Sequence, residues 1–236
     1  MRRRIALLGA TLLAPLALSG CIGVEGKQAE TLLQRASAAQ DVVRSERFVV
    51  RFDFEGDGHK VTMAMQGGGY LRGPRAGDFY FTMTGTGAPE LNAMDIRVMR
   101  RGNVAAVRVN GQTHSMPAPK AQQQFGSPTD MLELAKYVKS VSVDDANLGD
   151  RPADRIVGTL DTNALLKSSG NLATKLLEAE GVQISDIRAV LFVPRDTHLV
   201  EVMFADVDLT GEGHELHMHM SIATSGVNKP VAIPAF

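Results

Sequence analysis

The sequence predicts an α+β fold, in which a curved antiparallel sheet carries helices over its concave face. Short segments in both halves of the chain alternate apolar and polar residues with a period of two, as half-buried strands do. Tight polar turns separate these segments, which is typical of antiparallel strands. Segments with a helical period precede the first group of strands and separate the two groups, which favours helices on one side of a single sheet. A long antiparallel sheet twists, so one face is concave and can be covered by those helices.

The first helix and the first strand have the clearest patterns. Residues 29–43 carry apolar side chains at helical spacing and predict an amphipathic helix. In residues 48–54 every second side chain is apolar and faces the same way, while Arg51 and Asp53 point to the other face. After a turn at residues 56–58, residues 61–65 alternate again and predict the second strand of a hairpin. The apolar face of the first strand comprises Phe48, Val50, Phe52 and Phe54.

Three glycines at residues 67–69 interrupt the alternation and predict a flexible turn. A third strand is expected at residues 78–84, and two further strands are expected around residues 96–98 and 107–109. The meander of short strands therefore continues to the middle of the chain. The apolar residues that share a face in the third strand are Phe79, Phe81 and Met83.

The second half of the chain begins after a polar connection at residues 117–126. Ser127 suits the N-cap of a helix, Pro128 its first position and Asp130 the acidic position of a capping box. These residues predict that a helix begins there. The expected elements are a helix at 127–138, a strand at 154–160, a helix at 162–181 and strands at 187–193, 199–209 and 214–223.

The N-terminus has the features of a secretory signal. Three arginines at residues 2–4 precede an apolar run at residues 5–18, which is too short for a membrane-spanning helix. Residues 18–21, Leu-Ser-Gly-Cys, resemble a bacterial lipobox, which implies that Cys21 is acylated on its sulfur and becomes the new N-terminus. An ordinary signal peptide with a free thiol nearby is the alternative. The chain is expected to divide into a lipoprotein signal peptide at 1–20, a tether at 21–28 and a single domain at 29–236.

The charge of the mature chain excludes some partners. The whole sequence has 25 basic and 26 acidic residues, and removal of the three signal arginines leaves 22 against 26. This mildly acidic balance argues against a nucleic-acid partner and against a polybasic membrane footprint. Cys21 is the only cysteine, so no disulfide is expected. Acyl chains on Cys21 would hold the protein at the extracytoplasmic face of the cell membrane, in the periplasm or outer envelope, without spanning it.

Residues 214–219 are the stretch most suggestive of a metal site. On a strand, His217 and His219 share one face, and two imidazoles at this spacing can bind zinc or copper when a third ligand is present. The alternative is an ordinary polar strand face opposite an apolar one. Since the sequence supplies no closed ligand set, we expect no metal and no cofactor.

The sequence offers little support for catalysis, and we expect that the protein is not an enzyme. It has no Gly-x-Ser-x-Gly motif, and an acylated cysteine cannot act as a nucleophile. Two acid pairs, one at residues 144–145 and the other formed by Asp206 and Asp208, are interpreted as loop and strand-surface charges.

The mature chain resembles the actinobacterial LppX/LprA/LprF/LprG lipoprotein family and, more distantly, the LolA/LolB lipoprotein carriers. The resemblance covers most of residues 29–236. It depends on the order and spacing of segments that include residues 32–36, 128–132, 153–160 and 228–234. It implies a half-open β-barrel, or half-barrel, whose helices enclose an apolar cavity for acylated lipids. The chain departs from the family in having no tryptophan.

Together these observations favour an anchored lipoprotein that binds an acylated lipid or glycolipid and carries it across the cell envelope, with an unidentified membrane transporter as a possible partner. The alternative is an anchored envelope scaffold with a solid core and no ligand, and a weaker candidate is a metal binder. A lipid cavity needs apolar walls with few polar groups. The candidate cavity residues are Phe48, Val50, Phe52, Phe54, Met63, Met65, Phe79, Phe81, Met83, Leu191, Met203, Met218 and Met220.

Overall fold

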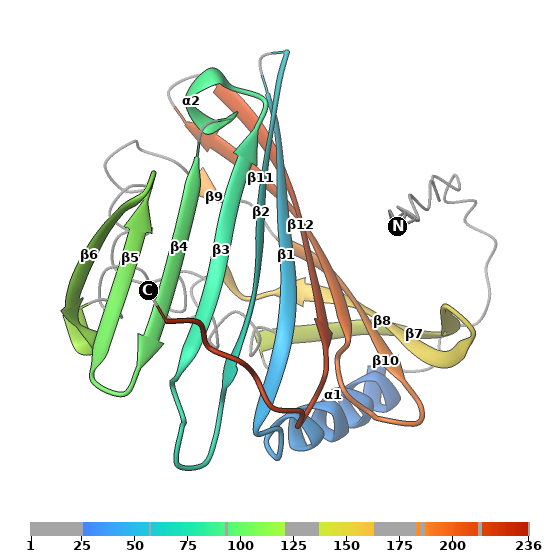
Figure 1. Ribbon diagram of the computed structural model, residues 1–236. Helices are drawn as coiled ribbons and strands as arrows, with labels where there is room; N and C mark the ends of the chain where they lie inside the picture. The colour runs from blue at the N-terminus through green and yellow to red at the C-terminus, as the bar shows by residue number, and fades with distance from the viewer. Residues whose placement is uncertain are drawn as a thin grey trace, which may run out of the picture.

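The computed structural model describes residues 26–56, 58–92, 94–120, 137–162, 183–184, 187–211 and 214–235. Their strands form one large antiparallel sheet, which is open and curved (Figure 1). The elements in chain order are α1 (Gly26–Gln40), β1 (Ser45–Gly56), β2 (His59–Tyr70), β3 (Phe79–Thr86), α2 (Pro89–Asn92), β4 (Asp95–Arg101), β5 (Val104–Val109), β6 (Gln112–Pro117), β7 (Val138–Leu148), β8 (Arg151–Leu160), β9 (Gln183–Ile184), β10 (Ile187–Pro194), β11 (Val202–Gly211) and β12 (His214–Ser225).

The sheet joins the two halves of the chain through its first and last strands. Its strand order is β6-β5-β4-β3-β2-β1-β12-β11-β10-β8-β7, and β9 pairs with β11 beside this path. Strands β1 to β6 follow one another as antiparallel neighbours, and β12 then pairs along β1. As a result β6 and β7, which are consecutive strands in the chain, lie at opposite edges of the sheet (Figure 1). The predicted curved antiparallel sheet is confirmed.

Helix α1 begins and ends earlier than its apolar pattern predicts. It starts at Gly26, so residues 26–28 belong to the helix and not to a tether. It ends at Gln40, where the guanidinium of Arg72 donates hydrogen bonds of 3.1 Å to the carbonyl oxygens of Gln40 and Val43. The carbonyl of Gln40 is one that a helix end leaves without an intrahelical partner, and Val43 lies just beyond the helix.

The three glycines at residues 67–69 do not form a turn, and this prediction was wrong. They lie inside β2, between β1 and β3. A Cβ at Gly67 would overlap the carbonyl oxygen of Tyr80, and a Cβ at Gly69 would lie 2.9 Å from the Cβ of Phe79. Glycine is therefore required here by the close approach of neighbouring strands.

Other differences arise where the alternation is weak. Strands β6, β7 and β9 were not predicted, and the acid pair at residues 144–145 lies on β7 and not in a loop. β7 is an edge strand with an irregular register between Ser140 and Ser142, so its pattern of apolar residues is interrupted. The expected helix at 127–138 lies outside the described residues except for its end, where Val138 begins β7. The helix expected at 162–181, except for Thr162, and the lipobox also lie outside them.

The apolar core lies on one face of the sheet, which we call the inner face. Alternate residues of the strands form a single buried cluster there, together with Ala29 and Ala36 from α1. Side chains such as Ile156 and Leu191 are fully buried. Each contributes about 1.5–3 kcal/mol relative to an exposed side chain. None of the described helices is long and apolar enough to cross a membrane.

A C-terminal segment at residues 226–235 crosses the opposite face, which we call the outer face (Figure 1). Val231 and Ile233 of this segment are buried. The hydroxyl of Tyr70, on β2, lies 3.1 Å from both the backbone nitrogen and the carbonyl oxygen of Val231, and Arg101 on β4 donates to the carbonyl oxygen of Ile233 at 2.7 Å. The segment therefore ties the outer faces of β2 and β4 together. All of the described elements lie between residues 26 and 235.

The close packing of β2 predicts that Gly67→Ala lowers the free energy of unfolding by about 1–3 kcal/mol, because the new methyl group forces two strands apart. Urea denaturation of the mature chain measures this loss. Gln66→Ala, at the neighbouring exposed position of the same strand, is the control and should change stability by less than about 0.5 kcal/mol. Equal stability of the two variants would contradict the close approach.

Candidate functional site

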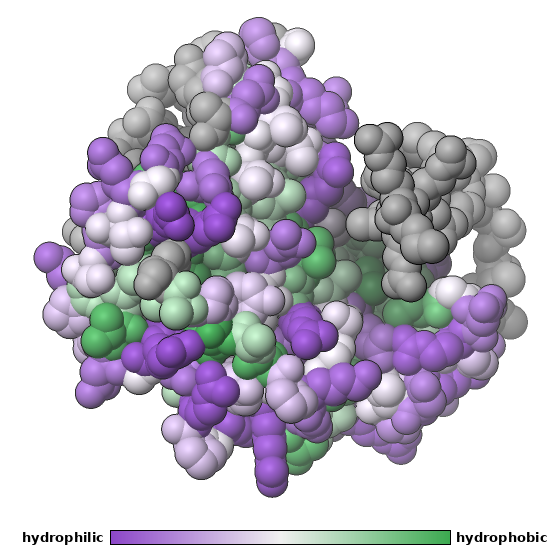
Figure 2. Space-filling model, viewed as in Figure 1, coloured by the Kyte–Doolittle hydropathy of each residue, from purple (hydrophilic) through white to green (hydrophobic). Residues whose placement is uncertain are grey.

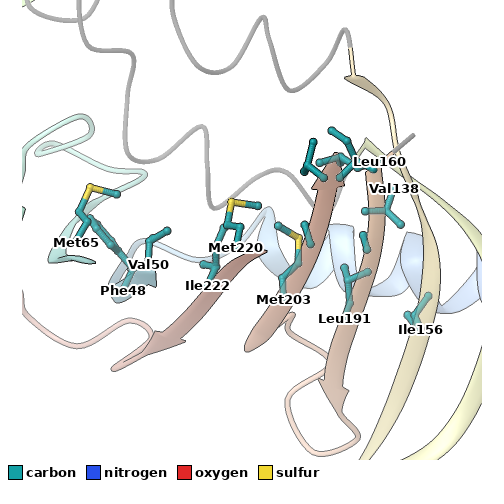
Figure 3. Packing of buried hydrophobic residues seen from close by; sticks show 14 of the residues in the cluster. Phe48, Val50, Met65, Val138, Ile156, Leu160, Leu191, Met203, Met220 and Ile222 are labelled. Carbon is teal, nitrogen blue, oxygen red and sulfur yellow. The ribbon is translucent and has the colours of Figure 1, made fainter. Parts of the chain in front are cut away.

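The register of the strands assembles a continuous apolar row on the inner face. Val50 of β1 lies opposite Met65 of β2 and Ile222 of β12. The row continues to β11 and β10: Met203 of β11 lies opposite Ile222, and Leu191 of β10 lies opposite Met203. Figure 3 shows these side chains projecting from neighbouring strands as one surface. The candidate site is therefore the inner face itself and not a cluster of catalytic groups.

All thirteen candidate cavity residues have the strand phase of this face, and they divide into two classes of exposure. The division follows their position along the strands. The buried residues are Phe48, Val50, Met65, Phe79, Phe81, Leu191, Met203 and Met220. The half-buried residues are Phe52, Phe54, Met63, Met83 and Met218.

The half-buried residues gather at one end of the sheet, which we call the half-buried apolar end. Phe54 lies opposite Val61 and Met218 there, beside the turn that joins β1 to β2. Large apolar side chains that keep part of their surface in water gain free energy when another apolar group covers them. The residues that define this end are Phe52, Phe54, Val61, Met63, Met83, Leu209, Leu216 and Met218.

The sequence analysis did not place Val61, Leu209 and Leu216 in the candidate site. Each occupies the inner-face phase of a strand, opposite Phe54 in the case of Val61, while Leu209 and Leu216 oppose each other across β11 and β12. Val61 and Leu216 could have been identified from the sequence, because each lies two residues before a candidate residue, Met63 or Met218, and so has the same strand phase.

The other end of the inner face contains a buried carboxylate. Glu46 shares the phase of Phe48 and Val50, and only 1% of its surface is exposed. The side-chain amide of Gln40, at the end of α1, lies 3.3 Å from both carboxylate oxygens of Glu46. A buried carboxylate is costly unless it is hydrogen-bonded, so this contact fastens the helix to the sheet. The predicted first strand began at residue 48, and for that reason Glu46 was missed.

The two candidate metal ligands lie on the outer face, each beside an aspartate. Nδ1 of His217 is 2.7 Å from a carboxylate oxygen of Asp208, and Nδ1 of His219 is 2.7 Å from one of Asp206. Asp206 and Asp208 are strand-surface charges, as expected. Among the residues that the structure describes, no group of three or more potential ligands is placed to hold a metal ion.

A second charge pair lies beside these histidines. Asp53 lies opposite His219 across β1 and β12. It accepts hydrogen bonds of 2.7 and 2.9 Å from Arg51 and one of 2.5 Å from the hydroxyl of Thr62. The bonds from Arg51 are the main reason that the pKa of Asp53 lies below its ordinary value. Around Asp53 and these histidines, the outer face therefore carries paired polar groups opposite the apolar inner face.

Comparisons with known proteins identify the fold. No protein-family model and no curated protein matches the sequence. Among solved structures, LprF from Mycobacterium bovis is 14% identical with a TM-score of 0.56, and the match covers 89% of this chain and 97% of that one. The lipoprotein LppX from Mycobacterium tuberculosis is 14% identical with a TM-score of 0.52, covering 89% of this chain and all of that one. The expected structural resemblance is confirmed, and at this identity it shows a shared fold.

The Arg51–Asp53 pair predicts an acid-dependent contribution to stability. Because the pKa of Asp53 is lowered in the folded state, the contribution is present above the ordinary pKa of about 4 and is lost as the pH falls through the lower folded value. Asp53→Asn should therefore flatten the decline of unfolding free energy between about pH 5 and pH 2. At neutral pH its cost should stay below about 1 kcal/mol, since the pair is near the surface. Arg51→Gln should have the same effect. If the stability changes of the two single variants add up in the double variant, the two residues do not interact, which would contradict the pairing.

Proposed function

We propose that the protein is a membrane-anchored extracytoplasmic lipoprotein that binds an acylated lipid or glycolipid against the inner face of its sheet and carries it across the cell envelope. The observation that carries this proposal is the apolar inner face, which is continuous across the sheet and remains half-buried at one end. An acyl chain placed there is removed from water at a gain of about 0.8 kcal/mol for each methylene that is buried. No chemical step is needed, in keeping with a protein that is not an enzyme.

The methionine side chains of the site suit a flexible apolar ligand. Met63, Met83 and Met218 lie at the half-buried apolar end, and methionine side chains adapt to irregular apolar surfaces. The fold shared with LprF and with the lipoprotein LppX agrees with this proposal. In the proposed arrangement, the helices expected between β6 and β7 and between β8 and β9 cover the concave face and close a cavity over the acyl chains.

The anchor completes the proposal. Cys21, acylated on its sulfur, would hold the domain on the membrane surface by a tether of at most a few residues, because α1 begins at Gly26. A carrier held in this way exchanges its ligand with a membrane or with a transporter in that membrane. We assign no metal and no cofactor to this function.

An envelope scaffold with a solid core is the second candidate. It is favoured by the tight packing of one half of the sheet, where several inner-face side chains have no exposed surface. These are Ile156, Ile187, Ala189, Leu191 and Ala205. A scaffold would use the same face for stability alone and would bind no lipid.

Native mass spectrometry separates the two candidates. The protein is the mature chain from residue 21 with Cys21→Ser, so that it carries no acyl chain of its own, purified from bacterial extracts without detergent. We expect a population whose excess mass equals that of an acylated lipid, because the apolar inner face is stable only when it is covered. Protein that is repeatedly free of lipid would contradict the carrier function and leave the scaffold.

Met83→Trp tests the site on the inner face. Met83 lies between Met65 and Ile96 on neighbouring strands, so a larger ring should occupy space that an acyl chain needs. We expect the bound lipid fraction to fall while unfolding free energy changes by less than about 1 kcal/mol; a solid core would instead be strained by about 1–3 kcal/mol. Thr84→Trp, at the next position of β3 on the outer face, is the matched control and should leave the lipid fraction unchanged.

A further inference from the structure

Positive charge is concentrated at one end of the molecule, although the mature chain is mildly acidic. We call this group the basic end, and it surrounds the start of β1, the β2–β3 loop, the β4–β5 turn and the start of the C-terminal segment. Figure 2 shows hydrophilic side chains along this lower edge of the molecule. The described residues of the basic end are Arg44, Arg47, Arg72, Arg75, Arg100, Arg101 and Lys229.

Backbone contacts bring these distant parts of the chain together. The backbone nitrogen of Arg44 donates to the side chain of Asn228 at 2.7 Å, and the nitrogen of Leu71 donates to the carbonyl oxygen of Arg44 at 2.8 Å. The hydroxyl of Ser45 donates to the carbonyl oxygen of Lys229 at 2.7 Å. The ends of β1 and β2 and the segment after β12 therefore meet at one place.

The remaining members join the group through side chains. Arg75 lies 4.1 Å above the ring of Tyr70 and donates to its hydroxyl at 3.0 Å. Arg101 reaches the C-terminal segment through its bond to Ile233. Arg100 packs beside Gly77 in the β2–β3 loop. The sequence separates these residues widely, so only the fold makes them neighbours.

Two cations of the basic end, Arg72 and Arg75, are paired with acids. Asp41 pairs with Arg72 at 3.2 Å, and Asp78 pairs with Arg75 at 3.2 Å. Asp78 is nearly buried, and Glu46 is buried on the inner face. Arg44, Arg47 and Lys229 are exposed beside these two pairs, so the exposed charge at this end is mainly positive.

Two arginines beside the β10–β11 turn, Arg195 in the turn and Arg151 at the start of β8, are compensated in a different way. Arg195 there pairs with both Asp145 and Asp154. Arg151 pairs with both Glu201 and Asp196. Each of these guanidiniums has two carboxylates, so this part of the surface has no comparable excess of positive charge.

The basic end and the expected anchor lie at opposite ends of α1, whose 15 residues span about 22 Å at 1.5 Å per residue. Helix α1 runs along the same end of the sheet, and Arg44 follows it directly (Figure 1). Four residues lie between Cys21 and Gly26, so the five steps of about 3.5 Å from one to the other span at most about 18 Å. This part of the reasoning rests on the anchor in the proposed function, whereas the charge distribution does not.

We propose that the basic end is a docking surface for an anionic membrane, where arginine and lysine side chains contact the phosphates of lipid headgroups. Guanidinium groups match phosphate oxygens in geometry, and each cation near an anionic surface adds to the attraction. Docking in this orientation directs the half-buried apolar end, which lies at the other end of β1, away from the anchoring membrane. The ligand would then be exchanged at the far side of the domain.

Vesicle sedimentation tests the docking surface. The protein is the mature chain with Cys21→Ser, and the vesicles are phosphatidylcholine alone or phosphatidylcholine with about 30% phosphatidylglycerol. We expect binding only to the anionic vesicles, and we expect it to weaken strongly between about 0.05 M and about 0.5 M salt. Arg44→Gln, Arg47→Gln and Lys229→Gln together should lower the partition coefficient at least about ten-fold.

The matched control is Lys60→Gln, Arg108→Gln and Arg188→Gln, which removes three charges from exposed positions outside the basic end. It should retain the binding of the parent chain. Equal binding to both kinds of vesicle, or an equal loss in the two triple variants, would overturn the proposal. If the first triple variant does not fold, as judged by circular dichroism, Lys229→Gln alone with the salt titration decides. Lipid occupancy of the inner face is measured separately, so failure here does not bear on the carrier function.

Discussion

The pairing of β1 with β12 is the contact on which the rest of the structure depends. It joins a sheet half formed before residue 118 to a half formed after residue 137, and it makes their apolar faces continuous. Val50 opposite Ile222 and Phe52 opposite Met220 lie at the centre of that junction. Because side chains alternate between faces, a shift of one residue would turn these side chains into water. The pairing therefore determines both the stability of the sheet and the existence of one apolar surface.

The two ends of this surface differ in character. Near α1 the inner face is buried, closed by the helix and by the contact between Gln40 and Glu46. At the β1–β2 turn its side chains keep contact with water. The basic end lies at the closed end, so the exposed cations and the half-buried apolar side chains are separated along the strands. In the proposed function this separation lets one end hold to a membrane while the other takes up or releases a lipid.

Local pattern predicted the strands well wherever one side faced the core and the other faced water. β1, β3, β10 and β12 have such alternation, and their positions were correct to within a few residues. The prediction failed at residues 67–69, where glycine is required by close neighbours and not by a turn. It also failed at β7, because an edge strand with an irregular register has no regular apolar face. In both places the deciding contacts come from other strands, which local pattern does not contain.

The sequence by itself determined which side chains face inward, because a period of two is a local property of an extended chain. It also indicated the resemblance to lipoproteins that the shared fold supports. Only the tertiary structure decided which inward side chains are fully covered and which stay half-buried, since burial depends on strands and helices far away in the chain. The same holds for the basic end. Net charge averages over the whole chain, whereas attraction to a surface depends on charges that the fold brings to one place.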